Sequence, residues 1–70
     1  MALRIGRCRL PEWLRKRDMS QAEFARRLGV SESFVTKIIN EEKHLSYLRA
    51  KIASDILSCT MEELYEWDHQ

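Results

Sequence analysis

The chain has 70 residues, of which 44% are hydrophobic and 33% are charged, and its formal net charge is +1. A chain of this length folds as one domain, and its modest core cannot also enclose a deep pocket, which argues against an enzyme with a small-molecule substrate. Because it has neither an apolar run long enough to span a bilayer nor a signal-peptide pattern, we expect a cytoplasmic protein with no membrane partner.

Residues 1–9 have no apolar periodicity and are predicted to form a loose, basic arm. The first helix is expected over residues 10–17, since Pro11 suits a first helical turn, where its missing N–H is no loss. Leu10, Trp13 and Leu14 are spaced by three and four residues, which places them on one apolar stripe. Asp18 tolerates the left-handed conformation in which this helix is expected to end.

Two helices joined by a tight turn are predicted over residues 20–40. Ser20 and Glu23 have the spacing of a capping box, so the second helix starts there and ends before Gly29. Gly29 suits a left-handed helix end because it has no Cβ. Ser31 is an N-cap, and the third helix is expected to run from residue 31 or 32 to about Asn40.

The small and apolar residues of these two helices have the spacing of a DNA-binding helix-turn-helix. Val30 is expected to fill the turn, and Ala25 is small where the two helices must pass close to each other. The apolar residues of the two inward faces are Phe24, Leu28, Val35 and Ile38.

Residues 41–45 form a polar connection, after which Ser46 is expected to cap a fourth helix that extends through Ser58. Its predicted inward-facing residues are Leu48, Ile52, Ala53, Ile56 and Leu57. Thr60 and Glu63 repeat the capping-box spacing and predict a short fifth helix that contains Met61, Leu64 and Tyr65.

No run shows the period of two that marks a half-buried strand, so the expected fold is all-α. It is a compact bundle of five short helices over residues 10–67. Residues 1–70 are expected to form one domain, with residues 68–70 as a tail and no effector domain beyond residue 70.

The charges are unevenly distributed along the chain. Residues 1–30 carry eight basic and three acidic side chains, whereas residues 53–70 carry five acidic side chains and no lysine or arginine. The basic part is therefore the one expected to meet phosphate, while the acidic part faces away or binds a different partner.

The cysteines and histidines predict no metal site and no cofactor. Cys8 and Cys59 are far apart and lack the paired spacing of a zinc site, and His44 and His69 complete no ligand motif with them. We expect two reduced thiols in a cytosol. No Cys/His pair, paired carboxylate or serine nucleophile has a spacing that places it beside an activating base, so an enzyme is rejected.

The chain resembles the lambda-repressor and Cro-like helix-turn-helix family, also called the xenobiotic-response-element family. The residues that carry the resemblance lie in 19–25, 28–31, 35–38 and 61–64, within a match that covers about residues 10–67. The resemblance implies a five-helix domain that binds operator DNA, usually as a homodimer, with the third helix in the major groove.

The resemblance also assigns roles to individual residues. Gln21 corresponds to the family's phosphate-contacting glutamine, at a helix N-terminus that favours negative charge. The helix period independently turns Thr36 and Asn40 outward. The predicted base-reading residues are Ser31, Glu32, Ser33, Thr36 and Lys37. The predicted phosphate-binding residues are Gln21, Asn40, Lys43, Arg4, Arg7 and Arg9.

Three positions depart from the family pattern. Leu14 and Ile39 stand where the family commonly has a buried arginine and glutamate, and an apolar pair can replace such an ion pair without loss of stability. Glu41 and Glu42 follow Asn40 where the family often has a glycine and a basic residue, and their charges would repel phosphate. Phe34 stands on a flank that is often polar, where packing on the fourth helix, a thymine methyl or a protein partner would suit it.

Two functions remain open at this point. The first is a sequence-specific regulator of phage or mobile-element type, a repressor that occupies an operator. The second is an antitoxin or anti-repressor that keeps the fold but binds another protein through its acidic fourth and fifth helices or through Phe34. Glu41, Glu42 and the low net charge favour the second.

Overall fold

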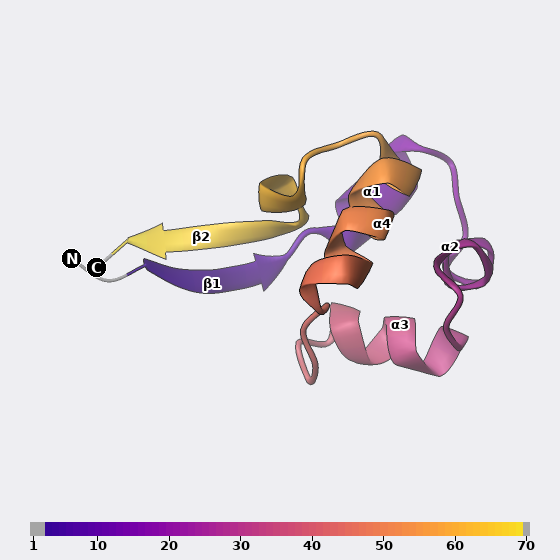
Figure 1. The fold of residues 1–70 in the computed structure, drawn as a ribbon, viewed down its shortest axis with the longest axis horizontal. Helices are drawn as coiled ribbons and strands as arrows, with labels where there is room; N and C mark the ends of the chain where they lie inside the picture. The colour runs from indigo at the N-terminus through magenta and orange to yellow at the C-terminus, as the bar shows by residue number, and fades with distance from the viewer. Residues whose placement is uncertain (1–2, 70) are drawn as a thin grey trace.

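Four α-helices pack into a bundle, and a two-stranded sheet extends from one end of it (Figure 1). The computed structural model describes residues 3–69. The elements in chain order are β1 (Leu3–Cys8), α1 (Leu10–Lys16), α2 (Gln21–Leu28), α3 (Glu32–Ile39), α4 (Tyr47–Leu57), a 3₁₀ turn η1 (Met61–Leu64) and β2 (Tyr65–His69). No helix in this part of the chain is long and apolar enough to cross a membrane.

The core lies where all four α-helices and η1 meet. The stripe predicted on α1 is buried, as are the inward faces predicted for α2 and α3, so these three predictions are confirmed. The prediction for α4 is wrong at Leu48, which is 67% exposed in the first turn of that helix, whereas Ala53 and Leu57 are fully buried. The largest fully buried side chains are Phe24, Leu10, Ile38, Leu57, Leu64 and Val35.

All four α-helices end in the same backbone motif, in which one left-handed residue lets two N–H groups turn back to the last carbonyls. In α2 this residue is Gly29, with φ of 81°, and the N–H of the following Val30 donates to the Ala25 carbonyl at 3.0 Å. The other three helices end in left-handed residues that carry a side chain. They are Asp18, Glu41 and Ser58.

The loose arm predicted for residues 1–9 is wrong over residues 3–8, because these residues form β1 and pair with β2 in an antiparallel ladder. Ile5 lies opposite Trp67, and Arg4 lies opposite Asp68. A bulge follows Ile5, where Gly6 allows close approach: a Cβ there would lie 2.9 Å from the Glu66 carbonyl oxygen.

The predicted fifth helix is likewise wrong, because one 3₁₀ turn over residues 61–64 gives way at Tyr65 to extended backbone. The fold is therefore a mostly helical domain with a small sheet, not an all-α five-helix bundle. Residues 68 and 69 of the predicted tail belong to β2. Residues 1, 2 and 70, which complete the predicted arm and tail, lie outside the described residues.

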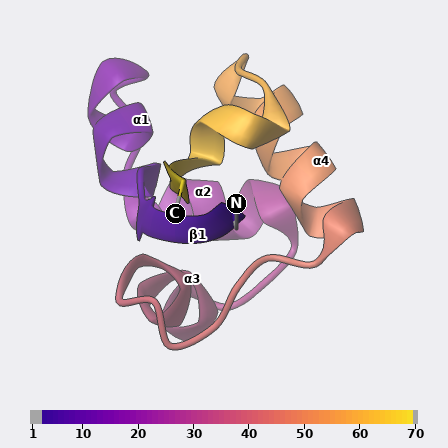
Figure 2. The same ribbon diagram turned by 90° about the vertical axis from the view of Figure 1, so that its left-hand side faces the viewer.

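Side chains of α1 and of its C-cap residue Arg17 bind carbonyl groups at η1 and at the end of α4. Trp13 donates its indole N–H to the Glu63 carbonyl at 2.8 Å, and Arg17 Nε donates to the Leu57 carbonyl at 2.7 Å. Figure 2 shows α1 and α4 to either side of the hairpin and α3 below it. In the described part of the chain, the outward-facing side of α3 is not covered by the hairpin or by another helix.

Candidate nucleic-acid interface

The helices α2 and α3 each begin at a serine N-cap. Ser20 Oγ accepts the N–H of Glu23 at 3.1 Å, and Ser31 Oγ accepts the N–H of Phe34 at 3.1 Å, as predicted for N-caps. The Glu23 carboxylate pairs instead with Arg27 at 2.8 Å, one turn later. Each helix therefore begins at a fixed residue, which sets the direction of its outward side chains.

One polar contact joins the start of α2 to the middle of α3. The Thr36 hydroxyl lies 3.3 Å from Oε1 of Gln21 and 3.2 Å from the Glu32 carbonyl oxygen, and its single proton can serve either acceptor. Gln21 is half-buried beside the N-terminus of α2. The residue predicted to contact phosphate and a residue predicted to read bases are therefore neighbours.

The outer face of α3 is polar and open. Ser33, Thr36 and Lys37 are exposed, while Val35 and Ile38 are turned into the core. The ion pairs found among the described residues include Arg9–Glu12, Arg27–Glu23 and Lys51–Asp55, and Lys37 takes part in none of them. Lysine donates to guanine O6 and N7, and this face therefore presents a free donor of the required kind.

The two residues at the start of α3 are more restricted. Ser31 is exposed, but its hydroxyl oxygen already accepts the Phe34 N–H. The contact that Ser31 can still make with a base is chiefly a hydrogen bond donated by its hydroxyl group. Glu32 is exposed in the first helical turn, where a carboxylate is favoured by the helix dipole. It is an acceptor that suits cytosine N4.

The C-terminal end of α3 places opposite charges close together. Asn40 caps the helix and Lys43 lies exposed in the loop beyond it. Glu41 and Glu42 are also exposed, and Glu41 has a φ of 66°. This φ is in the left-handed region, which glycine adopts without strain. The family often has glycine after this asparagine, so Glu41 takes the place of a residue better suited to the position.

The arginines of the predicted arm do not lie beside α2. Arg4 and Arg7 are exposed on β1, and the hairpin and α2 occupy opposite ends of the long axis (Figure 1). Arg9 pairs with Glu12 at 3.3 Å, and its guanidinium lies 5.7 Å from the ring centroid of Trp13. The structure therefore brings Gln21 together with α3, whereas Arg4 and Arg7 lie on the hairpin, away from α2.

Arg15 and Gln21 line the same hollow, and no spacing in the sequence distinguishes Arg15 from the other seven basic residues of residues 1–30. The two line an open hollow of about 620 Å³ whose other walls come from the end of α1 and the turn before α2. Arg15 is exposed, and a guanidinium next to a helix N-terminus forms a suitable environment for phosphate. Arg15 lies in α1 and Gln21 opens α2, so the turn between these two helices sets the relative position of the two residues.

Phe34 packs against the core and lies under Arg49 of α4, whose guanidinium is 5.6 Å from its ring centroid. The prediction that Phe34 packs on the fourth helix is confirmed.

Both cysteines are free, and burial raises the pKa of the Cys8 and Cys59 thiols, which keeps them protonated and weakly reactive. No cluster of metal-ligating side chains is found among the described residues.

Comparison with known proteins agrees with this geometry. A family model described as Helix-turn-helix matches residues 12–64, which is most of the chain. The chain belongs to this family. It is the Cro/C1-type, lambda-repressor-like group of DNA-binding transcriptional regulators, which are not enzymes.

Among solved structures, this helix-turn-helix chain is similar to the transcriptional regulator VanUg. The TM-score is 0.72 at 23% sequence identity, and the alignment covers 100% of this chain and 92% of that one. At this identity the likeness supports the fold, including the parts outside the family match. No curated protein sequence matches the chain.

Proposed function

We propose that the chain is a sequence-specific regulator that occupies an operator as a homodimer and acts as a repressor. In this proposal α3 lies in the major groove, with Lys37 reading guanine and Ser31, Glu32, Ser33 and Thr36 offering further contacts to base edges. The observation that carries it is the open polar face of α3, on which Lys37 is exposed and Thr36 contacts Gln21 at the start of α2.

Phosphate contacts position the protein without reading sequence. Gln21 and Arg15, which line one hollow at the start of α2, support such a contact, and Asn40 and Lys43 are candidates at the other end of α3. Arg4 and Arg7 lie on the hairpin, away from α2, and Arg9 is paired with Glu12, so this proposal does not depend on these three arginines. The resemblance favours a repressor of phage or mobile-element type acting in the cytoplasm.

Selection of bound fragments from random duplex DNA tests this proposal. We expect a near-palindrome whose half-sites lie about 10 base pairs apart, because two copies of α3 must enter successive major grooves on one side of the duplex. Enrichment of an asymmetric single site would refute the homodimer. A pool with no enriched sequence would refute sequence-specific regulation.

The second candidate is an interaction module that binds another protein. Its support is the acidic surface of η1 and β2, where Glu62, Glu63, Glu66 and Asp68 are exposed, together with Glu41 and Glu42 at the end of α3. An antitoxin or anti-repressor of this kind would bind a basic partner, and its affinity for duplex DNA would be weak and independent of sequence.

A further inference from the structure

An apolar surface that the helix-turn-helix does not use joins the hairpin to the start of α4. Ile5 and Trp67 lie opposite each other in the ladder, so their side chains share one face, and Leu3 is on the same face two residues earlier. These two paired residues and Tyr47 also line one groove of about 340 Å³, together with Leu45, Ala50 and Met61. We call this groove and Leu3 the hairpin surface.

The hairpin surface leaves large side chains in contact with solvent. Tyr47 is 83% exposed, Leu3 is 60%, Ile5 is 44% and Trp67 is 39%. Arg4 and Asp68 lie opposite each other on the other face of the ladder, so the hairpin is apolar on one side and charged on the other. A two-stranded sheet is only marginally stable in water unless something covers its apolar face.

The charges on the two strands of the hairpin disfavour edge-to-edge pairing between two copies of the chain. Symmetric edge-to-edge pairing would set β1 against β1 or β2 against β2. β1 carries Arg4 and Arg7 and β2 carries Glu66 and Asp68, so either pairing brings like charges together. Among Leu3 and the residues that line the groove, Glu62 alone is a charged residue.

We propose that a second copy of this chain covers the hairpin surface, face to face, about a two-fold axis. The surface is self-complementary because it holds both a projecting side chain, Tyr47, and an apolar groove beside it, so each copy can insert its tyrosine into the groove of the other. This inference rests on the homodimer of the proposed function and assigns the surface that forms it.

The area available is close to what a stable dimer needs. The exposed parts of the four large apolar side chains amount to roughly 450 Å², taking about 200 Å² for a whole large side chain. A standard interface buries about 800 Å² on each partner, about 65% of it apolar in homodimers. The surface also shares no residue with the proposed DNA contacts of α2 and α3, so both can be occupied at once.

Sedimentation equilibrium of the full chain without DNA tests the proposal. We expect a monomer–dimer equilibrium at micromolar concentration, and Tyr47→Asp should raise the dissociation constant about tenfold or more. Aspartate suits the first turn of a helix, so this variant keeps the fold, which far-UV circular dichroism checks. Ile5→Thr, which keeps a β-branched residue in the strand, should weaken the dimer in the same direction.

Leu48→Asp is the matched control, because Leu48 is also an exposed apolar residue in the first turn of α4 but does not line the groove. It should leave the dissociation constant unchanged. A monomer up to millimolar concentration, growth beyond the dimer, or equal weakening by Leu48→Asp would overturn the assignment. A dimer that binds no DNA would refute the proposed function and leave this surface standing. A chain that is monomeric without DNA but still selects a two-fold symmetric operator would overturn this surface and leave the proposed function standing.

Discussion

The Thr36 hydroxyl lies 3.3 Å from Oε1 of Gln21, so a side chain of α3 touches the residue that opens α2. A donated hydroxyl proton would orient the Gln21 amide so that its NH₂ group points away from α3. The amide would then be held ready to donate to a phosphate oxygen, at the end of α2 where backbone N–H groups also point outward.

Thr36→Val should weaken binding to a random-sequence duplex by about 0.5–1.5 kcal/mol, because it removes the hydroxyl that orients Gln21. The same substitution in a Gln21→Ala background should have almost no effect on that duplex. Fluorescence anisotropy titrations of the four proteins measure this coupling, and Thr36→Ser is the control that retains the hydroxyl. Additive losses would show that Thr36 does not act through Gln21.

Glu41→Gly should raise the free energy of unfolding by about 0.5–1 kcal/mol. The left-handed conformation costs a residue with a Cβ about 1–2 kcal/mol, and the greater freedom of glycine in the unfolded chain offsets part of the gain. Urea titration provides the measurement. Glu42→Gly removes a neighbouring carboxylate at a position outside the left-handed region and should give no gain; equal stabilisation by both variants would assign the effect to charge.

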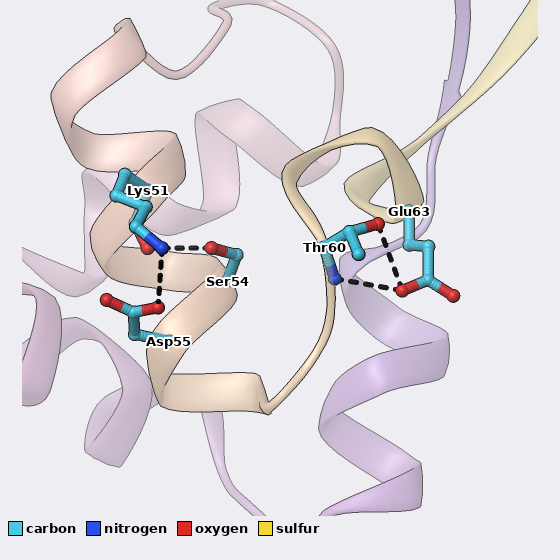
Figure 3. A network of polar contacts seen from close by, with 5 residues as sticks. All are labelled: Lys51, Ser54, Asp55, Thr60 and Glu63. Atoms are coloured by element: carbon cyan, nitrogen blue, oxygen red, sulfur yellow. Dashed lines mark hydrogen bonds and ion pairs between the residues drawn. The ribbon is translucent and has the colours of Figure 1, made fainter.

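Stability should fall in acid partly through Glu63. Hydrogen bonds from the Thr60 N–H, at 2.8 Å, and from its hydroxyl, at 3.0 Å, hold the pKa of this carboxyl below its usual 4.5 (Figure 3). A carboxyl whose pKa is lowered by folding stabilises the fold above its unfolded pKa, and this contribution is lost as the pH falls through the folded pKa.

Glu63→Gln should therefore melt at a lower temperature than the parent chain at pH 7, and the difference should shrink below about pH 4.5. Thermal unfolding at a series of pH values measures it. Glu62→Gln, in the same turn but outside the capping contact, is the control. A difference that stayed constant with pH would contradict the role given to the ionised carboxylate.

We predict that Leu14 and Ile39 contact each other and replace the buried ion pair that is common in the family. Leu14 is buried and Ile39 is half-buried against the core. Leu14→Arg alone should cost about 3 kcal/mol, since it leaves a buried charge without a partner, and adding Ile39→Glu should recover much of this loss. Chemical denaturation of the two single variants and the double variant decides it, with additive losses as the contrary result.

Much of the helical part of the fold could be predicted because its signals are local. Ser20, Ser31 and Ser46 begin their helices within a few residues of the apolar positions that follow, and Gly29 ends α2 by its own backbone preference. The residues of α3 that face outward follow from the helix period once Val35 and Ile38 are assigned to the core. These interactions span only a few residues, so the sequence pattern shows them directly.

The hairpin could not be predicted in the same way, because its partners lie at opposite ends of the chain. Leu3-Arg4-Ile5 and Tyr65-Glu66-Trp67 do alternate between apolar and polar residues, but each run is too short to stand out. The hollow that Arg15 and Gln21 share also lies outside what helix spacing reveals, because the turn between α1 and α2 sets its shape.

The central claim is that α3 reads DNA through Lys37, and binding to the best selected duplex over a range of salt concentrations tests it most directly. For the parent chain the logarithm of the association constant should fall with the logarithm of salt concentration with a slope of several units, as counterions leave the phosphates. Lys37→Ala should cost about 1–3 kcal/mol on that duplex and relax the preference at one base position. A flat salt dependence, or an unchanged base preference in Lys37→Ala, would contradict the claim.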